Sequence, residues 1–488
     1  MNASAALLAV ISAPVAHALL VMTLARPPGL RDVIHILFAC AVAALAVVLM
    51  QAAAHGDAAH VVLARPLPNV ELAFALEPLA ALRAVVVASL SVLHAVHTVG
   101  MARAMQTRAP GRMMGFMALA VAAAMGVAFS ANLFTFFVAY QALTLATFPL
   151  VALEGDETSR LAARTYLGTL LTASVGLFLP AMVWTYALTG TIDFRTGGAL
   201  AGRVDALTAN VLLVLFVLGV AMSAIPPTHR WLPASTQAPF PALVSIQAIT
   251  VLPAGGIGLL KISAYVFGSA LHDARFAALG LLILVGVSMC VAALIALSKQ
   301  DIRERLAYTC MAQSLAAALG ALLALPAGAF AAALQIVALS CAGATLLMAA
   351  GTVAAATGRT KVADYAGLGR AMPWTLAGFA LGAASMIGMP PLSGAWAKLW
   401  LIIAAADAGL VWAAVLAGVT AVLTFAHLGP LAANALVGPA PTDPFRKPEG
   451  ASFMLVAPVI LAAAATLWLL VLADPLARFL APLWAPQA

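Results

Sequence analysis

Long apolar runs make up most of the chain, and they constrain its fold more than any other feature. Stretches of at least about 18 apolar residues recur from the beginning to the end of the sequence. Each is long enough to cross the hydrocarbon layer of a membrane as a helix, which takes about 20 residues. Only 8% of the residues are charged, whereas about a quarter are charged in a typical soluble protein. The sequence therefore predicts an all-α polytopic membrane protein.

Counting the apolar runs gives fourteen expected transmembrane segments. They lie at residues 5–25, 32–53, 76–100, 113–130, 132–153, 163–190, 207–225, 241–270, 276–298, 303–324, 327–357, 371–405, 409–438 and 453–482. We expect the first to be a retained helix and not a cleaved signal peptide, because no basic stretch precedes it and a second apolar run follows directly. Several runs are too long for one straight helix and should contain a break or a turn.

Lysine and arginine are distributed unevenly between the two sets of loops that this count defines. Loops after odd-numbered segments, together with the segment ends that adjoin them, hold sixteen of the 24 basic residues, and the other side, counted in the same way, holds five. The remaining three, Arg83, Lys261 and Lys398, lie deeper within segments. Because cytoplasmic loops carry the excess of basic residues, both termini are expected on the non-cytoplasmic side of the cell (plasma or inner) membrane.

The sequence contains no motif of soluble enzyme or nucleic-acid chemistry. The net charge of +7 follows from the loop bias, and no basic soluble face is available for nucleic acid. The four cysteines lie in apolar runs without a CxxC or Cys/His cluster, and no P-loop, GxGxxG or nucleophile motif is present. We therefore expect no catalytic residue, no metal and no cofactor in this chain, and any catalysis would belong to an assembly around it.

Two proline pairs interrupt long apolar segments. Pro226 and Pro227 follow the seventh segment in GVAMSAIPPTHRWLP, and Pro390 and Pro391 lie inside the twelfth in SMIGMPPLSGAWAKLW. Proline removes a backbone donor and breaks a helix interior. Broken helices at corresponding places in two halves of a transporter indicate an internal repeat with the ion path near the breaks. Since the two sites are five segments apart, the repeats would have inverted topology.

Four stretches resemble one family of membrane proteins, in the order of that family. Residues 226–262 read PPTHRWLPASTQAPFPALVSIQAITVLPAGGIGLLKI, similar to the pattern P-x-H-x-W-L-P … A-P-x-P … A-G … G-L-L. The others read NLFTFFVAYQALTLATFPLVALEG (132–155), LSKQDIRERLAYTCMAQSLAAALG (297–320) and GLGRAMPWTLAGFALGAASMIGMPPLSGAWAKLW (367–400). The chain resembles the antiporter-like subunits, which are the large membrane subunits of respiratory complex I, membrane-bound hydrogenases and multi-subunit cation/proton antiporters.

The resemblance implies an architecture of two inverted five-helix repeats with broken helices 7 and 12. The corresponding division is 1–112 for helices 1–3, 113–270 for the first repeat (helices 4–8), 271–438 for the second (helices 9–13) and 439–488 for the C-terminal loop and helix 14. In this family, protons are thought to move along a buried polar axis at mid-membrane. The axis includes a glutamate in span five and lysines in spans seven, eight and twelve.

Most of the family's charged positions are uncharged in this sequence. The residues at these positions are Gln141, Met222, Gln247, Pro253, Gln335, Leu339 and Gly343, in spans five, seven, eight and eleven. Only the lysine of span twelve is kept, as Lys398 in GAWAKLW. An intramembrane charge costs roughly 2.5–3.5 kcal/mol and persists only for a partner or a function. Because most of these charges are missing, we expect a degenerate first half-channel and limited ion transport by the chain itself.

Six residues remain candidates for an ion path: Lys398, Lys261, His229, Gln141, Gln247 and Gln335. Glutamine cannot ionise but can bridge a water chain, and histidine can relay protons. For Lys261 we favour a side chain that extends to the membrane edge. Glu77 and Arg83 are expected to neutralise each other. His94 and His97, three apart on one helix face, are expected to be core histidines and not ligands.

Three functions remain open for such a chain. The first is a membrane subunit of a multi-subunit complex that translocates protons or cations (H+ or Na+), with other membrane subunits, including further antiporter-like ones, as partners. The second is a purely structural paralogue in such an assembly. The third is the membrane subunit of an energy-coupled bicarbonate or CO2 uptake complex, on which a soluble carbonic-anhydrase-like protein docks.

Overall fold

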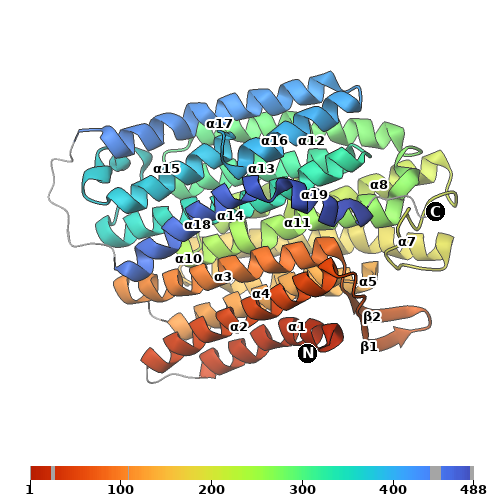
Figure 1. The fold of residues 1–488 in the computed structure, drawn as a ribbon, viewed down its shortest axis with the longest axis horizontal. Helices are drawn as coiled ribbons and strands as arrows, with labels where there is room; N and C mark the ends of the chain where they lie inside the picture. The colour runs from red at the N-terminus through yellow and green to blue at the C-terminus, as the bar shows by residue number, and fades with distance from the viewer. Residues whose placement is uncertain (1, 24–27, 108, 440–451, 484–488) are drawn as a thin grey trace.

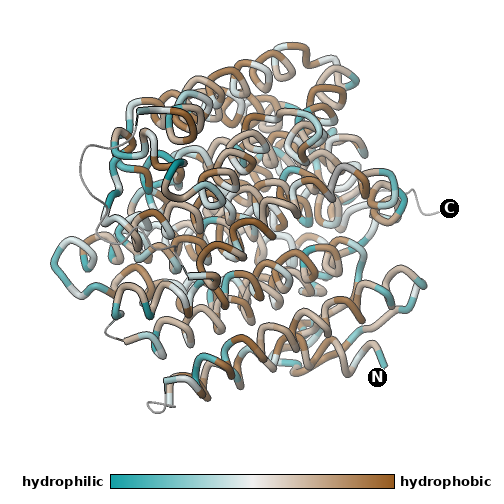
Figure 2. The backbone as a smooth tube through the Cα atoms, turned by 60° about the vertical axis from the view of Figure 1, so that its left-hand side comes forward, coloured by the Kyte–Doolittle hydropathy of each residue, from teal (hydrophilic) through white to brown (hydrophobic). Residues whose placement is uncertain are grey.

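A computed structural model describes residues 2–23, 28–107, 109–439 and 452–483 of the chain. In these ranges the helices run alongside one another in a bundle (Figure 1). Within the described residues, ten helices are long and apolar enough to cross a membrane, and shorter apolar helices lie at Ala206–Gly219, Pro373–Ile387 and Phe453–Leu467. Apolar residues line the helices, and the hydrophilic residues gather at turns (Figure 2). The all-α polytopic class is confirmed, while the count of fourteen spans stays a prediction.

The first part of the chain forms four long helices and one hairpin. Its elements are α1 (Ala3–Thr23), α2 (Pro28–Ala54), β1 (His60–Leu67), β2 (Val70–Ala75), α3 (Pro78–Ala104) and α4 (Pro110–Phe129). The last three of these helices begin at a proline, whose missing N–H is not needed in a first helical turn. The hairpin lies at one end of the bundle (Figure 1) and is an addition to the helical fold that the sequence predicts.

The hairpin is joined to the next helix by hydrogen bonds. Strands β1 and β2 pair antiparallel around Asn69, which has a φ of 60°. Asn132 caps the following helix by accepting from the backbone N–H of Thr135 at 2.8 Å, and its amide donates to the Glu71 carbonyl at 2.8 Å. The Thr135 hydroxyl in turn accepts from the Ala73 N–H at 2.9 Å. The hairpin is therefore tied to a helix end.

The middle of the chain contains shorter and more irregular helices. They are α5 (Leu133–Val151), α6 (Glu157–Ala173), η1 (Ser174–Phe178), α7 (Leu179–Thr189), α8 (Ala206–Gly219), η2 (Ala221–Ser223), η3 (Thr228–Arg230), α9 (Trp231–Ser235), α10 (Phe240–Leu243), η4 (Val244–Ile249), α11 (Val251–Lys261), η5 (Ile262–Phe267) and η6 (Gly268–Leu271). Three of them, η1, η4 and η5, are π-helical turns. Such turns often occur at functional sites.

The last part of the chain completes the bundle. Its elements are α12 (Arg275–Ser298), α13 (Ile302–Leu322), α14 (Pro326–Thr357), η7 (Val362–Tyr365), η8 (Leu368–Arg370), α15 (Pro373–Ile387), α16 (Ser393–Asp407), α17 (Val411–Val437), α18 (Phe453–Val471), α19 (Ala473–Leu480) and η9 (Ala481–Leu483). The predicted division at residues 112, 270 and 438 stays a prediction.

Two helical stretches of 32 residues form the centre of the bundle. One runs from Phe240 to Leu271 through α10, η4, α11, η5 and η6, and the other is α14. The most apolar 18 residues of each are all buried. A helix that is apolar on every side is one that packs on every side. The polar side chains on these two stretches are therefore enclosed by protein.

Both proline pairs interrupt helices, as the sequence predicts. Helix α8 ends at Gly219, and Pro226 and Pro227 lie between η2 and η3. Pro390 and Pro391 lie between α15 and α16. Each pair is joined by a cis peptide bond. The breaks in the seventh and twelfth predicted segments are confirmed, and the functional site is built from them.

Candidate functional site

Lys398 lies where the second helix break supplies it with partners. Its Nζ donates to the carbonyl of Met386 and to the Oε1 atom of Gln313, both at 2.8 Å. Met386 belongs to the last turn of α15, whose carbonyls have no donor within the helix and which carries the negative end of the helix dipole. The break therefore provides a place where a buried ammonium group can be held without a carboxylate.

Two glycines allow the chain to close around this lysine. Gly388 ends α15 with a φ of +96°, and a Cβ there would lie 2.7 Å from Lys398 Cδ. Gly394 opens α16 against the carbonyl of Ser385, which a Cβ would approach to 1.8 Å. Left-handed φ values favour glycine. Both glycines are therefore needed for the position of Lys398 beside the end of α15.

Gln313 links Lys398 to Gln335. The Oε1 atom of Gln313, on α13, also accepts from Gln335 Nε2 on α14 at 2.8 Å. Both glutamines are at most 2% exposed. Among the described residues, Gln313 Nε2 and Gln335 Oε1 have no protein partner, although buried polar atoms normally have one, often a water molecule. The three side chains form a buried polar group that we call the lysine–glutamine cluster: Lys398, Gln313 and Gln335.

Helix α13 contacts both helix breaks with adjacent residues. Gln313 reaches Lys398 at the second break, and the hydroxyl of Ser314 donates to the carbonyl of Ser223 at 2.9 Å, at the first break. Adjacent residues on a helix point about 100° apart, so one helix can reach two sides. The two breaks, far apart in the sequence, are thus joined through a single turn of α13.

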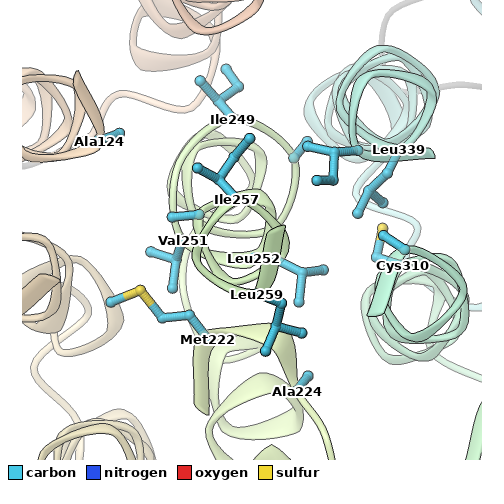
Figure 3. Close-up of a cluster of buried hydrophobic side chains, with 14 of the residues drawn as sticks. Ala124, Met222, Ala224, Ile249, Val251, Leu252, Ile257, Leu259, Cys310 and Leu339 are labelled. Carbon is cyan, nitrogen blue, oxygen red and sulfur yellow. The ribbon is translucent and has the colours of Figure 1, made fainter. Parts of the chain in front are cut away.

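The first break has no titratable side chain at the position where the family has a lysine. Met222 is fully buried and belongs to the same apolar cluster as Val251, Leu252 and Leu259 (Figure 3). Its backbone N–H donates to the hydroxyl of Tyr140 at 2.9 Å. The structure therefore fills this place with apolar side chains.

The other departures from the family pattern are equally apolar or paired locally. Gln141 is half-buried and its Nε2 donates to Ser174 Oγ at 2.8 Å. Pro253 lies in the first turn of α11, shortly after the π-helical turn η4 ends at Ile249. At Gly343 a Cβ would lie 3.3 Å from that of Ala248 and 3.5 Å from Met386 Cε. A lysine there would have to displace both neighbours.

Gln247 and His229 lie apart from the lysine–glutamine cluster in the hydrogen-bond network. Gln247 is fully buried on η4, and its Nε2 donates to Ser235 Oγ at 3.1 Å. His229 is half-buried on η3, beside the first break. Of the six candidate residues, the structure therefore joins Lys398 and Gln335 through Gln313. Gln141, Gln247 and His229 have other surroundings.

Lys261 is paired and buried, and the expectation that it extends to the membrane edge is wrong. Its ammonium group forms an ion pair with Glu77 and donates to the Ser130 carbonyl at 2.8 Å. It also lies 5.1 Å from the centre of the Phe194 ring. The Lys261 side chain is 0% exposed and that of Glu77 20%. Glu77 directly precedes α3 beside the hairpin and from there reaches the end of α11. The two residues are too far apart in the sequence for this contact to be predicted.

Replacing Glu77 with glutamine should destabilise the protein by about 2 kcal/mol, because it leaves a buried ammonium group unpaired. The loss is smaller than for a fully buried pair, since the Glu77 side chain is partly exposed. Thermal unfolding of the purified assembly measures it. Arg65→Gln is the control, because Arg65 pairs with Glu71 at the surface, with a side chain that is 73% exposed. Equal losses for the two variants would contradict this assignment.

The sequence suggested that Arg83 pairs with Glu77, but in the structure it does not. Its guanidinium group donates to the carbonyl of Ile249 and to Ser340 Oγ at 3.3 Å, and the residue is only 3% exposed. None of the ion pairs in the described ranges includes Arg83. A positive charge from α3 therefore lies between the two central helical stretches, at the end of η4.

The turn between α12 and α13 is charged and partly exposed. Lys299 and Glu304 form an ion pair at 2.8 Å. The hydrogen bond from Glu304 raises the pKa of the Lys299 amino group. The backbone of this turn pairs with the chain after α14, where the Ile302 N–H donates to the Thr360 carbonyl at 2.8 Å. The turn thus anchors the start of α13.

Sequence reasoning missed Gln313 and Ser314, which the structure places at the centre of the site. Both lie within the apolar run of α13, in the stretch MAQSLAAALG. A polar pair inside a membrane segment is a functional signal by itself. That signal could have identified the two residues, although not their partners.

Comparisons with known proteins agree with this fold. Residues 130–424 match the family described as NADH:quinone oxidoreductase/Mrp antiporter, TM. The chain is 30% identical over 325 residues to NADH-quinone oxidoreductase subunit N of Desulforudis audaxviator, covering 62% of this chain and 61% of the relative. It is 28% identical over 286 residues to a Na(+)/H(+) antiporter subunit of Alkalihalophilus pseudofirmus, covering 57% and 56%. The match thus spans about three fifths of each relative.

Solved structures share the fold over nearly the whole chain. One is the Mrp complex from Dietzia sp. DQ12-45-1b, with a TM-score of 0.88 and 23% identity over 100% of this chain and 98% of that one. Another is respiratory complex I from Thermus thermophilus with bound NADH, with a TM-score of 0.82 and 23% identity over 98% and 100%. Together, the fold and the helix breaks define a polytopic membrane protein of the antiporter-like class. Because the family match covers more than half of the chain, the chain belongs to the NADH:quinone oxidoreductase/Mrp antiporter family.

Proposed function

We propose that this chain is a membrane subunit of a multi-subunit complex in the plasma or inner membrane, and that it transfers protons through the lysine–glutamine cluster. The observation that carries the proposal is the bonding of Lys398 to Met386 and Gln313 at a helix break. An amine exchanges a proton directly, whereas sodium requires oxygen ligands and is repelled by an ammonium group. The chemistry of the cluster therefore favours protons over sodium.

The first half of the chain is proposed to be a degenerate half-channel. Met222 stands among apolar side chains, and Gln141 is bonded only to Ser174 among the described residues. Neither can bind and release a proton near neutral pH. The chain would therefore contribute one proton-transfer step, and further antiporter-like subunits of the assembly would contribute others. The excess of basic residues in alternate loops supports an orientation with both termini outside the cytoplasm.

Two glutamine substitutions test this proposal in the intact assembly reconstituted into lipid vesicles. Gln313→Leu should lower the initial proton flux at least about tenfold, a loss of about 1.4 kcal/mol in the transfer barrier. It removes the link between Lys398 and Gln335. Flux is followed with a pH-sensitive dye under an imposed gradient or with the assembly's own energy source.

Gln141→Leu is the matched control in the first half. Its partner Ser174 keeps a hydrogen bond to the Leu170 carbonyl at 2.8 Å, so the substitution leaves no donor unpaired there. We expect a change in flux of less than about twofold, within the range of a neutral site. Equal losses for Gln141→Leu and Gln313→Leu, or a larger loss for Gln141→Leu, would overturn the assignment of the path to the second half.

Purification with partners attached distinguishes the kinds of assembly. Iron–sulfur or quinone-binding subunits would indicate a respiratory or hydrogenase complex, and further antiporter-like subunits alone would indicate an antiporter. A soluble carbonic-anhydrase-like partner would indicate uptake of inorganic carbon. If no substitution in the lysine–glutamine cluster changes flux in any of these assemblies, the chain has a structural role and the proposed function is wrong.

A further inference from the structure

Three histidines from the first three helices meet beside the centre of the bundle. His17 of α1 and His35 of α2 form a hydrogen bond of 3.0 Å between their ring nitrogens. His94 of α3 lies on the wall of the same cavity. All three are between 5% and 6% exposed. Neither the family match, which begins at residue 130, nor the proposed lysine–glutamine cluster includes them.

The cavity between these histidines is large enough for water. Its volume is about 30 Å³, and about 10–15 Å³ is enough for one water molecule. Its polar lining consists of the three histidines, Ser91 of α3 and Ser245 of η4. Ser91 Oγ already donates to the Val87 carbonyl at 2.6 Å and can accept a further bond. A water molecule needs two to four polar partners, and this lining provides them.

The hydrogen bond of His94 determines which of its ring nitrogens carries the hydrogen. Its Nε2 lies 2.8 Å from the carbonyl of Pro241. Because a carbonyl only accepts, Nε2 carries the hydrogen, and Nδ1 of the neutral ring is an acceptor. In the His17–His35 pair one ring must donate to the other, so an added proton can be shared between the two rings. With water in the cavity, the histidines and serines form a sequence of proton donors and acceptors.

One end of this sequence leads to the protein surface. Asp32 lies three residues, or about 4.5 Å along the helix axis, before His35. It is bound by Arg31 at 2.9 Å and by Arg103 at 2.8 Å. The Arg103 side chain is 58% exposed. The other end is η4, the central π-helical turn that carries Gln247.

We propose that His17, His35, His94 and the cavity form a proton-access relay to η4 from the end of α1–α3 at which Asp32 and Arg103 lie. The relay would supply protons to the central helices from outside the two predicted repeats, and it rests on the proposed function. Its ligands are water molecules and an excess proton. In this way, the N-terminal helices compensate for the charges that the first half lacks.

The charged and titratable groups around the relay are consistent with this direction. Arg31, Asp32 and Arg103 lie at its surface end, and His97 lies three residues beyond His94 with a bond of 3.1 Å to Thr352. The lining from α4 is apolar, with Met117, Ala118 and Val121. Arg83 holds the Ile249 carbonyl at the inner end. The positive charge of Arg83 disfavours an excess proton at the Ile249 carbonyl. The proton therefore reaches η4 through the Ser245 hydroxyl.

The pH profile of flux in vesicles containing the intact assembly tests the relay. His35→Gln and His17→Gln should each lower flux about fivefold at pH 8 and less than about twofold at pH 6, because a relay limits transfer when protons are scarce. Ala118→Leu, which fills the cavity without touching a histidine, should give the same profile. His97→Gln is the control, since this buried histidine does not line the cavity, and its profile should match that of the parent.

The outcomes separate the relay from the proposed function. If Lys398→Met abolishes flux while His17→Gln, His35→Gln and Ala118→Leu leave the profile unchanged, the relay is overturned and the function stands. If the parent shows no proton flux, the proposed function fails. In that case, electron cryomicroscopy of the intact assembly decides: ordered water bonded to Ser245 or His94 supports the relay site, and a dry cavity overturns it.

Discussion

Replacing Lys398 with methionine in the intact assembly is expected to lower proton flux by at least tenfold, or about 1.4 kcal/mol in the barrier. The lysine is the titratable member of a cluster whose other members are glutamines, which cannot ionise. Methionine is unbranched and apolar, and fits irregular cores. Flux is measured in vesicles with a pH-sensitive dye, and assembly of the variant is checked by size-exclusion chromatography.

The fold should survive this substitution. Gln313 Oε1 keeps the hydrogen bond from Gln335 at 2.8 Å, so only the Met386 carbonyl loses its donor. An unpaired buried acceptor costs about 1–3 kcal/mol, and removal of a buried charge offsets part of that cost. A loss of flux with the assembly intact is thus a loss of proton transfer.

Two further substitutions distinguish proton exchange from fixed charge. Lys398→Arg keeps the positive charge, but arginine does not release its proton in proteins, so its flux should be as low as that of Lys398→Met. Lys361→Met is the control at an exposed lysine in the loop after α14, and its flux should equal that of the parent. Flux in Lys398→Arg close to the parent level would mean that Lys398 acts only as a fixed charge.

Gly255→Ala should destabilise the protein by at least about 3 kcal/mol or prevent its accumulation. A Cβ at Gly255 would lie 2.1 Å from the Ser223 backbone nitrogen and 2.3 Å from the Met222 carbonyl carbon. These atoms cannot rotate away, because the Ser223 N–H is bonded to Val220 at 3.0 Å. Its carbonyl is also bonded to Ser314 at 2.9 Å. The methyl group would therefore push α11 away from the first break.

Other glycines provide graded controls in the same thermal-unfolding measurement. At Gly256, next in the chain, a Cβ would lie 2.8 Å from Cδ1 and Cγ1 of Ile336, and these are side-chain atoms that can move. We expect an intermediate loss there. At Gly418 nothing lies within 4 Å, so alanine should be neutral or stabilising by up to about 1 kcal/mol. If Gly255→Ala melts with the parent, α11 does not pack on the break as described.

The helices and breaks were predictable because their signals are local. Apolar length defines a membrane helix, and a proline pair interrupts one whatever surrounds it. The hairpin at residues 60–75 was not predicted, since HVVLARPLPNVELAFA is short and lies between apolar runs. The π-helical turn η4 has no sequence signature of comparable strength. The outline of the bundle could therefore be predicted from local signals, but its irregular central helix could not.

Contacts between distant residues account for most of what was missed at the site. Lys398 was identified from its motif, but Gln313 lies 85 residues before it in the chain. Lys261 was expected at the membrane edge, yet Glu77, far away in sequence, holds it inside. The pairing of partners depends on how helices pack, and one sequence alone does not contain that information. Intramembrane polar residues are therefore better predictors of the members of a site than of its bonds.

A double-substitution experiment on Gln313 and Gln335 tests the central claim most directly. If the lysine–glutamine cluster transfers protons as one unit, Gln313→Leu should lower flux about tenfold and Gln335→Leu about threefold. The double variant should then lose no more than Gln313→Leu alone, because residues that act as a unit are not additive. A loss of about thirtyfold in the double variant would show that the two glutamines act independently, and would contradict a single path through Lys398, Gln313 and Gln335.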